Sequence, residues 1–268
     1  MSTTHFGDLE VLSLDPTGKQ RFDTPLLFVH GAYVGAWCWE EHYLPYFASR
    51  GFHCLAVSLS GHGGTRRHLP LDGFSISDYV DDLSAVIEAL DRPPALIGHS
   101  MGGFVVQKYL EKADVPATVL LCAVPPHGLL HATLGMMMAK PSLLVDLNRM
   151  MQGTTPPAES VAAGLFFQPM PQEALLRLAM RAQPESHRAI WDMTWFDLPC
   201  VSRAHRPPML VLGAAEDQII PPSQVEATAK AWGVDAHIFP NVGHGLMMET
   251  DWQAPATYIA DWLAETVS

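Results

Sequence analysis

Basic side chains are scarce in this chain: 16 Lys and Arg stand against 28 Asp and Glu, a formal net charge of -12 over 268 residues. Nucleic acid and anionic membrane surfaces are therefore disfavoured as partners, because both repel a protein of the same sign. A small neutral or apolar molecule is a more suitable ligand. The chain also lacks any run near the roughly 18 apolar residues of a membrane span, so we expect no stable membrane anchoring.

Cysteine is equally sparse, and its spacing matches neither a disulfide framework nor a metal site. We therefore expect reduced thiols and no metal. The first fifteen residues lack the basic-then-apolar layout of a secretory signal, so we expect a soluble, cytoplasmic protein. No heptad pattern predicts a particular oligomeric state. The cysteines are Cys38, Cys54, Cys122 and Cys200.

Short, nearly continuous apolar runs recur along the chain and predict strands of a sheet that is covered on both faces. Helical patterns lie between them, most clearly at Ser77–Leu90, where apolar residues recur every three or four positions. This alternation predicts an α/β fold with a doubly wound, mostly parallel sheet. The predicted strands are Leu26–Val29, Cys54–Leu59, Ala95–Gly98, Thr118–Val124, Met209–Leu212 and Ala236–Phe239.

One stretch, residues 125–206, shows helical patterns but no convincing strand. We interpret it as a helical cap inserted into a core domain of residues 1–124 and 207–268. The stretch is rich in methionine, whose flexible side chain adapts to apolar ligands, and we expect two or three of its eight methionines to line a substrate pocket. The predicted cap helices are Ser142–Met151, Pro157–Leu165, Gln172–Arg181 and Glu185–Phe196.

A serine flanked by glycines follows one predicted strand, in the segment Gly98-His99-Ser100-Met101-Gly102. This pattern is typical of a nucleophile elbow, a strained strand-to-helix turn in which larger side chains two residues before or after the serine would collide. The helix that follows points unpaired amides at the same place. The segment predicts a nucleophile, Ser100, and one oxyanion donor, Met101 N–H; a tight structural loop is the alternative.

A nucleophilic serine needs a base and a carboxylate that orients the base. Asp217 follows the predicted strand Met209–Leu212, and His244 lies between two glycines after the last predicted strand. Glu216 is the alternative candidate for this carboxylate. Asp217 is favoured because of its distance in sequence from Gly213 and Pro221. A helix N-cap or turn residue is the alternative role for Asp217.

The loop after the strand Leu26–Val29 is expected to supply the second oxyanion donor. A backbone amide with little steric cover is required, and Ala32 N–H meets this condition. Two such donors, each worth about 10²–10³-fold in rate, stabilise the charge that develops on a carbonyl oxygen. The residues expected beside the substrate are Gly31, Tyr33, His99, Met137, Phe166, Trp195 and Leu246.

Together these motifs resemble the α/β-hydrolases of the esterase, lipase and carbon–carbon hydrolase type, in which serine, acid and histidine follow in this order. The resemblance implies the α/β-hydrolase fold and no metal or organic cofactor. The loop that begins at Gly31 is also similar to the plant methylesterase and hydroxynitrile lyase branch. The matching segments are His30-Gly31, Ser60-Gly61-His62-Gly63, Gly98 to Gly102, Gly213 to Pro221 and Gly243-His244.

Two departures from these families stand out. Ser58 occupies the place before the Gly-His-Gly turn where family members often have an aspartate. The lyase branch is expected to carry a threonine beside the oxyanion loop and a lysine near the histidine, whereas here Ala32 follows Gly31 and Gly245 follows His244. These differences weaken the hypothesis that the chain is a hydroxynitrile lyase, an enzyme that cleaves cyanohydrins. His62 is better interpreted as a structural turn residue than as a second base.

We predict a serine hydrolase that cleaves a carboxylic ester with an apolar or small acyl group through an acyl-enzyme intermediate. The chain has no dinucleotide-binding fingerprint, which agrees with chemistry that needs no cofactor. Thioesterases, lactonases, amidases and carbon–carbon hydrolases use the same triad, so the fold does not separate them. A ligand receptor that keeps the triad without turnover is the alternative from another class.

Overall fold

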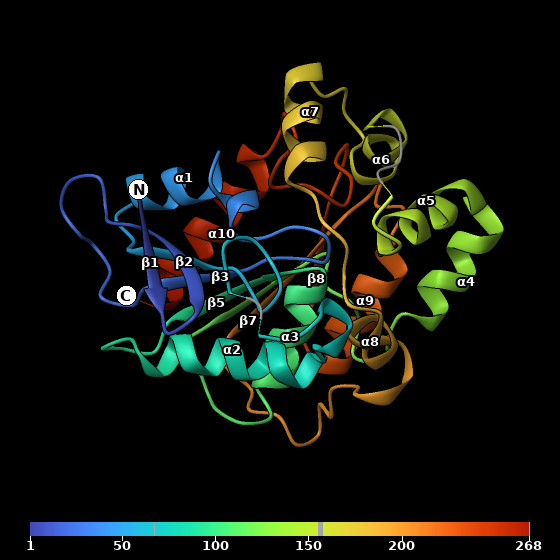
Figure 1. Cartoon of the computed structure of the whole chain (residues 1–268). Coiled ribbons are helices and arrows are strands. Elements are labelled where there is room, and N and C mark those ends of the chain that lie inside the picture. Colours follow the sequence, from blue (N-terminus) through green and yellow to red (C-terminus); the bar gives the residue numbers. More distant parts are fainter. Residues whose placement is uncertain (67, 155–157, 268) are drawn as a thin grey trace.

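The computed structural model describes residues 1–66, 68–154 and 158–267, which form an α/β fold around one eight-stranded sheet (Figure 1). The strand order is β1-β2-β4-β3-β5-β6-β7-β8. β1 and β2 pair antiparallel at one edge, and the strands from β4 to β8 run parallel. The doubly wound, mostly parallel sheet is therefore confirmed. The strands are β1 Ser2–Phe6, β2 Leu9–Leu14, β3 Leu26–Val29, β4 Cys54–Val57, β5 Ala95–His99, β6 Thr118–Leu121, β7 Met209–Ala214 and β8 Ala236–Phe239.

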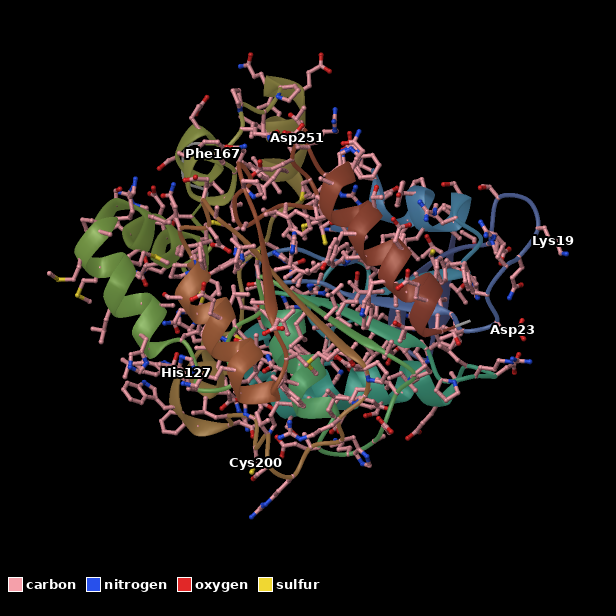
Figure 2. All side chains as sticks on the ribbon, turned by 180° about the vertical axis from the view of Figure 1, so that it is seen from behind. Lys19, Asp23, His127, Phe167, Cys200 and Asp251 are labelled. Atoms are coloured by element: carbon pink, nitrogen blue, oxygen red, sulfur yellow. The ribbon has the colours of Figure 1, made fainter. Side chains whose placement is uncertain are left out.

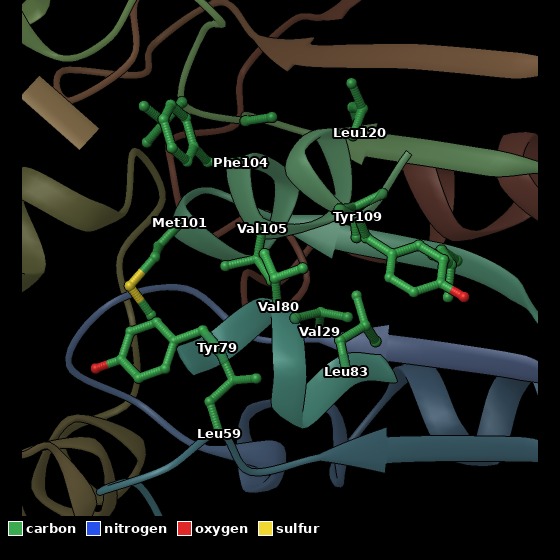
Figure 3. Close-up of a cluster of buried hydrophobic side chains, with 14 of the residues drawn as sticks. Val29, Leu59, Tyr79, Val80, Leu83, Met101, Phe104, Val105, Tyr109 and Leu120 are labelled. Carbon is green, nitrogen blue, oxygen red and sulfur yellow. The ribbon is translucent and has the colours of Figure 1, made fainter. Parts of the chain in front are cut away.

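Helices cover both faces of the sheet and bury two apolar clusters. On one face, α2 (Ile76–Glu88), α3 (Met101–Tyr109) and α9 (Pro222–Trp232) contribute to the first cluster. Figure 3 shows part of it, where side chains of α2 and α3 meet those of the strands. On the other face, α1 (Tyr43–Ser49) and α10 (Gln253–Thr266) complete the second. Each fully buried leucine or phenylalanine contributes about 1.5–3 kcal/mol to such a core.

Two predicted strands are too long, and the structure gives the reason. β4 ends at Val57 because Ser58 turns into the glycine-rich loop, where its hydroxyl bonds the Glu10 carboxylate of β2 and the Ala36 N–H. β6 ends at Leu121 because Cys122 has φ of 42°, a left-handed conformation that a strand does not accommodate. Both residues lie at the carboxyl edge of the sheet, where a doubly wound fold places its ligand site.

The β1–β2 hairpin was not predicted. β1 is almost entirely exposed, and its sequence, Ser-Thr-Thr-His-Phe, contains no apolar run. β2 alternates weakly between buried and half-buried positions. Such an edge pair depends on its partner strand, β4, rather than on a hydrophobic pattern of its own.

The segment between β6 and β7, described over residues 125–154 and 158–206, is called the insert below. Its helices cluster at one end of the sheet (Figure 1). They are α4 Leu130–Ala139, α5 Pro141–Met151, α6 Ala158–Leu165, α7 Gln172–Arg181 and α8 His187–Trp191, which a π-helical turn, Asp192–Phe196, extends.

Four helices of the insert were predicted with nearly these bounds, although the predicted start at Pro157 lies outside the described residues. The last begins at His187 rather than Glu185, because the Ser186 hydroxyl caps it by accepting the Ala189 N–H at 3.2 Å. α4 was missed, since its apolar residues surround the helix without forming a stripe. No helix of the described residues is long and apolar enough to cross a membrane.

Candidate active site

Ser100 lies on a sharp turn between β5 and α3. Its backbone has φ of 53° and ψ of -117°, an unusual conformation for a non-glycine residue. A Cβ on Gly102 would lie 2.3 Å from the Val29 carbonyl oxygen, and one on Gly98 would lie 2.7 Å from the Gly102 carbonyl oxygen. Both glycines are therefore sterically required, as the elbow pattern predicts.

The structure brings Asp217 and His244 into contact. His244 Nδ1 donates to Asp217 Oδ2 at 2.7 Å, and both side chains are almost completely buried. The other carboxylate oxygen accepts the N–H groups of Ile219 and Ile220, each at 2.8 Å. Asp217 thus orients the ring and also organises its own turn, so both roles considered for it occur together. Glu216 points to solvent.

Ser100 and His244 open on the same cavity, whose volume is about 680 Å³. Within the described residues no hydrogen bond joins Ser100 Oγ to the ring; such contacts are often long without substrate and tighten when it binds. Because Nδ1 donates to Asp217, Nε2 of a neutral His244 carries the lone pair and can accept a proton.

Most of the residues expected beside the substrate line this cavity. Met137 and Trp195 line it while remaining about half exposed, at 50% and 51%, so they lie where it opens to solvent. The expected substrate neighbours found there are Gly31, Tyr33, His99, Met137, Phe166 and Trp195, and the two predicted oxyanion donors, Ala32 and Met101, line the cavity as well.

The prediction for Leu246 is wrong. The chain turns inward after His244, with Met248 N–H bonded to the Gly245 carbonyl at 2.8 Å, and Leu246 is fully buried in the second apolar cluster. Met247 and Met248 line the cavity instead.

The expected number of insert methionines at the pocket is too low. α4, α5 and the π-helical turn all direct methionines at the cavity, whose walls are consequently mostly apolar and adaptable. The insert methionines that line it are Met136, Met137, Met150, Met151 and Met193.

The loop that carries Ala32 is tied to the insert. Tyr33 has φ of 67°, and its carbonyl accepts the Gln183 N–H at 2.9 Å. The Gln183 side chain also donates to the Gly61 carbonyl at 2.7 Å and accepts the Gly63 N–H at 3.1 Å. One insert residue therefore holds two loops of the sheet edge, although nothing in its local sequence indicates this role.

His99, next to Ser100 in the chain, supports the loop of His244. Its Nε2 donates to the His244 carbonyl at 2.9 Å. Burial, followed by the nearby His244, lowers the pKa of His99 from 6.5 to about 3, so the ring is neutral at physiological pH. A neutral ring bonded in this way cannot act as an acid near pH 7.

Ser58, which stands where the resembling families often have an aspartate, has a carboxylate partner from another strand. Its hydroxyl donates to Glu10 Oε1 at 2.7 Å and accepts the Ala36 N–H at 3.0 Å. The same Glu10 oxygen accepts the Gly64 N–H at 2.9 Å. β2 thus places a carboxylate beside the glycine-rich turn, 48 positions away in sequence from Ser58.

His62 is fully buried in a contact with Glu185 of the insert. Its Nε2 lies 2.9 Å from Glu185 Oε2, and its Nδ1 donates to the Ser60 carbonyl at 3.1 Å. Glu185 also accepts the Tyr79 hydroxyl at 2.8 Å. Both ring nitrogens face acceptors and the ring does not line the cavity, which agrees with a structural role.

One group of side chains in the described part of the chain has the composition of a metal site: ligand atoms of Cys122, Asp217 and His244 lie within 4.8 Å of one another. His244 Nδ1 and Asp217 already occupy each other in a hydrogen bond. Burial, and then the nearby Asp217, raise the pKa of the Cys122 thiol, which keeps it protonated and a poor ligand. The three groups fit a hydrogen-bonded cluster better than a metal centre.

The sheet, the strained serine and the paired acid and histidine define a hydrolase of the α/β class. The sequence model of the alpha/beta hydrolase family matches residues 26–260, and the chain belongs to this family.

Curated relatives match a smaller part of the chain. It is 39% identical to a non-heme chloroperoxidase of Streptomyces lividans over 110 residues, which cover 40% of this chain and 39% of that protein. It is 35% identical to the bifunctional esterase/perhydrolase DCH of Acinetobacter calcoaceticus over 109 residues, 39% of this chain and 38% of the relative. The matches thus span about two fifths of these relatives' lengths.

Solved structures extend the likeness of the fold to nearly the whole chain. An esterase of Exiguobacterium antarcticum superposes with a TM-score of 0.77 at 19% identity, covering 95% of each chain. The N-acyl homoserine lactonase AidH, in complex with N-butanoyl homoserine, gives a TM-score of 0.80 at 17% identity and covers 100% of this chain and 98% of its own. At such identities the likeness shows the fold alone.

Proposed function

We propose that this chain is a serine hydrolase that cleaves carboxylic esters with an apolar or small acyl group. The observation that carries the proposal is the buried Asp217–His244 pair, whose ring opens on the same cavity as the strained Ser100. The family membership and the esterase among its relatives support the same reaction class.

In the proposed reaction, Ser100 Oγ attacks the acyl carbon while His244 Nε2 accepts the hydroxyl proton. The tetrahedral intermediate then collapses, His244 returns this proton to the leaving alcohol, and an acyl-enzyme remains on Ser100. Water, deprotonated by His244, attacks the acyl carbon to form a second tetrahedral intermediate. This intermediate collapses as His244 returns the proton to Ser100 Oγ, which releases the acid and restores the free serine. Asp217 holds the ring in the required tautomer and stabilises its charged form.

The amides of Ala32 and Met101 are proposed to hold the oxyanion of both tetrahedral intermediates. Both residues line the cavity beside Ser100, and Met101 is the first residue of α3. The first amides of a helix have no partner within it, so the Met101 N–H is available to a substrate oxygen.

We further propose that the insert acts as a cap over the core domain and selects the substrate. The cavity wall that it supplies is dominated by methionine, leucine and aromatic side chains, which suits an apolar ester. Asp146 of α5, whose carboxylate accepts hydrogen bonds from Ser160 and Arg149, is a charged exception on this wall.

The test is hydrolysis of p-nitrophenyl butyrate by the purified protein and by Ser100→Ala. Loss of the nucleophile is expected to lower kcat roughly 10⁴- to 10⁶-fold. A fluorophosphonate should label the wild type and not the variant. Ser84→Ala, which removes a hydroxyl that donates to the Val80 carbonyl within α2, is the matched control. Full activity of Ser100→Ala would refute the proposal, and tight ester binding without product would favour a receptor.

A panel of esters, thioesters, lactones and carbon–carbon substrates then identifies the bond that is cleaved. Hydrogen peroxide belongs in this panel as a second nucleophile, because the matched Acinetobacter relative is a bifunctional esterase/perhydrolase. Formation of a peracid from the ester and peroxide, lost in Ser100→Ala, would assign that second activity to the same serine.

A further inference from the structure

The loop that carries His244 is fixed by three backbone hydrogen bonds to three different partners. Gly243 N–H donates to Glu249 Oε1 at 2.6 Å, and Gly245 N–H donates to the Leu165 carbonyl at 2.8 Å. The His244 carbonyl accepts from His99, as described above. The base is therefore tied to the elbow, to the insert and to one buried carboxylate.

That carboxylate, Glu249, joins the His244 loop to the insert. The oxygen that accepts Gly243 N–H also accepts Phe167 N–H at 2.9 Å, and Oε2 accepts Gln168 N–H at 3.4 Å. Glu249 is fully buried. Figure 2 labels Phe167, in the insert segment that Glu249 bonds, and Asp251, two residues after Glu249.

We propose that Glu249 is a positioning residue for His244: it holds residues 243–245 and residues 165–168 of the insert as one unit, so that the ring stays bonded to Asp217 and directed at the substrate. This inference rests on the proposed function, because it assigns a role in the same reaction.

The contacts leave little space for an alternative arrangement of the two segments. A Cβ on Gly243 would lie 2.8 Å from the Leu165 carbonyl oxygen and 3.0 Å from Glu249 Oε1. The segments thus meet backbone to backbone, and the three N–H groups need one compact acceptor between them. A carboxylate supplies it with charge-assisted hydrogen bonds, which are about twice as strong as neutral ones.

The chemistry of Glu249 argues against a purely space-filling role. Burial raises its pKa, while the N–H groups of Phe167, Gly243 and Gln168 oppose this shift. Among the described residues no cation pairs with it. A buried carboxylate without a cation is costly unless donors surround it, so its location depends on keeping the loop and the insert together.

The same unit reaches the substrate cavity. Phe166 lines the cavity, and its ring lies so close to Gly245 that a Cβ there would be 2.4 Å from ring atom Cε1. A substrate that contacts Phe166 therefore acts directly on the loop of the base. Glu249 limits how far that loop can move in response.

The test compares Glu249→Ala and Glu249→Gln with the wild type. We expect Glu249→Ala to lower kcat about 10- to 100-fold with KM nearly unchanged, as when a catalytic group is misplaced by about 1 Å. Glu249→Gln keeps one acceptor oxygen for Gly243 N–H and should recover much of the loss. The far-downfield proton signal of His244 Nδ1–H, assigned through His244→Ala, should broaden or shift in Glu249→Ala.

Glu111→Ala is the matched control, because Glu111 also accepts a backbone N–H, that of Cys200 at 2.9 Å, but lies away from the cavity. Gly243→Ala places a methyl group against the Leu165 carbonyl oxygen and Glu249 Oε1, and should also lower kcat. In the double variant with Glu249→Ala, the two losses in kcat should be less than additive. A folded Glu249→Ala protein with wild-type kcat and an unchanged His244 signal would overturn the proposal. The proton signal is independent of turnover, so an inactive wild type would count against the proposed function alone.

Discussion

Two buried histidine–carboxylate pairs lie in this molecule, and they differ in what the second ring nitrogen does. In the pair His244–Asp217, 2.7 Å apart, one nitrogen donates to the carboxylate and no described residue bonds the other. In the pair His62–Glu185, 2.9 Å apart, the second nitrogen donates to the Ser60 carbonyl. The first ring can accept a proton from a substrate or a serine, whereas both nitrogens of the second ring are already engaged by protein acceptors.

The comparison shows that burial and a carboxylate partner do not by themselves make a base. The location of the second ring nitrogen decides between these two pairs, because His244 lines the cavity and His62 does not. A third pair, His187 and Asp72 at 2.9 Å, lies on the surface, with side chains 48% and 63% exposed. Substitutions of the three carboxylates therefore should differ in kind as well as in size.

The largest effect is expected at Asp217. Asp217→Asn removes the negative charge and disturbs the tautomer of His244, so kcat should fall about 10⁴-fold while the protein stays folded. Steady-state kinetics on p-nitrophenyl butyrate and a thermal melt measure both quantities. Glu216→Gln, one residue earlier and exposed, is the control; if it lost activity instead, the acid would be misassigned.

Glu185→Gln should give the next largest effect, on stability rather than on kcat. Removing one partner of a buried ion pair typically costs about 3–5 kcal/mol in the free energy of unfolding. The pair lies outside the cavity lining, so kcat should change little. Urea unfolding with parallel kinetics checks this, and a large fall in kcat at unchanged stability would contradict the structural role of His62.

The same variant also tests the pH dependence of stability. Burial alone would raise the pKa of Glu185, but the charge and hydrogen bond of His62, together with the hydrogen bonds from Ser186 N–H and the Tyr79 hydroxyl, outweigh it, so the pKa lies below its usual 4.5. A carboxylate whose pKa is lowered in the folded state stabilises the fold at pH values above its pKa in the unfolded chain. This stabilisation is lost as the pH falls through the pKa of the folded state. Below about pH 4.5 the wild type should therefore lose stability more steeply than Glu185→Gln.

Asp72→Asn should have the smallest effect. The backbone N–H and then the ring of His187 lower the pKa of Asp72, but the pair is exposed and screened by water. Exposed pairs contribute at most about 1 kcal/mol, and an asparagine oxygen can still accept the His187 N–H. Unfolding in urea at low and high salt measures the difference, which should shrink further as salt rises. If Asp72→Asn lowered the free energy of unfolding as much as Glu185→Gln does, the expected difference between buried and surface pairs would be contradicted.

Local sequence patterns predict the centre of this fold well. β3, inside the sheet, has the predicted bounds because an apolar run between polar turns belongs to a buried parallel strand. β8 also has the predicted bounds, although it is a half-buried edge strand. The elbow was predicted for the same kind of reason, since Gly98 and Gly102 leave a steric signature within five residues. A structural feature whose physical cause lies within a few neighbouring residues can be predicted from those residues alone.

The features that were missed depend on distant partners. Glu249 reaches Phe167 across 82 positions, and Glu185 reaches His62 across 123. No spacing rule connects such residues before the chain has folded. Leu246 was wrongly assigned to the cavity for a related reason, because the direction of a side chain after a loop depends on the packing of the whole loop.

The family match begins at residue 26, yet a carboxylate that lies before it supports the rim of the site. Glu10, on strand β2 of the β1–β2 hairpin, accepts hydrogen bonds from Ser58 and Gly64. A fragment trimmed to the residues that the family model matches would leave these donors without their acceptor, next to the loop that Gln183 joins to the insert. The hydrogen-bonded frame of the site therefore extends beyond the residues that the family model matches, and the inconspicuous strand β2 belongs to it.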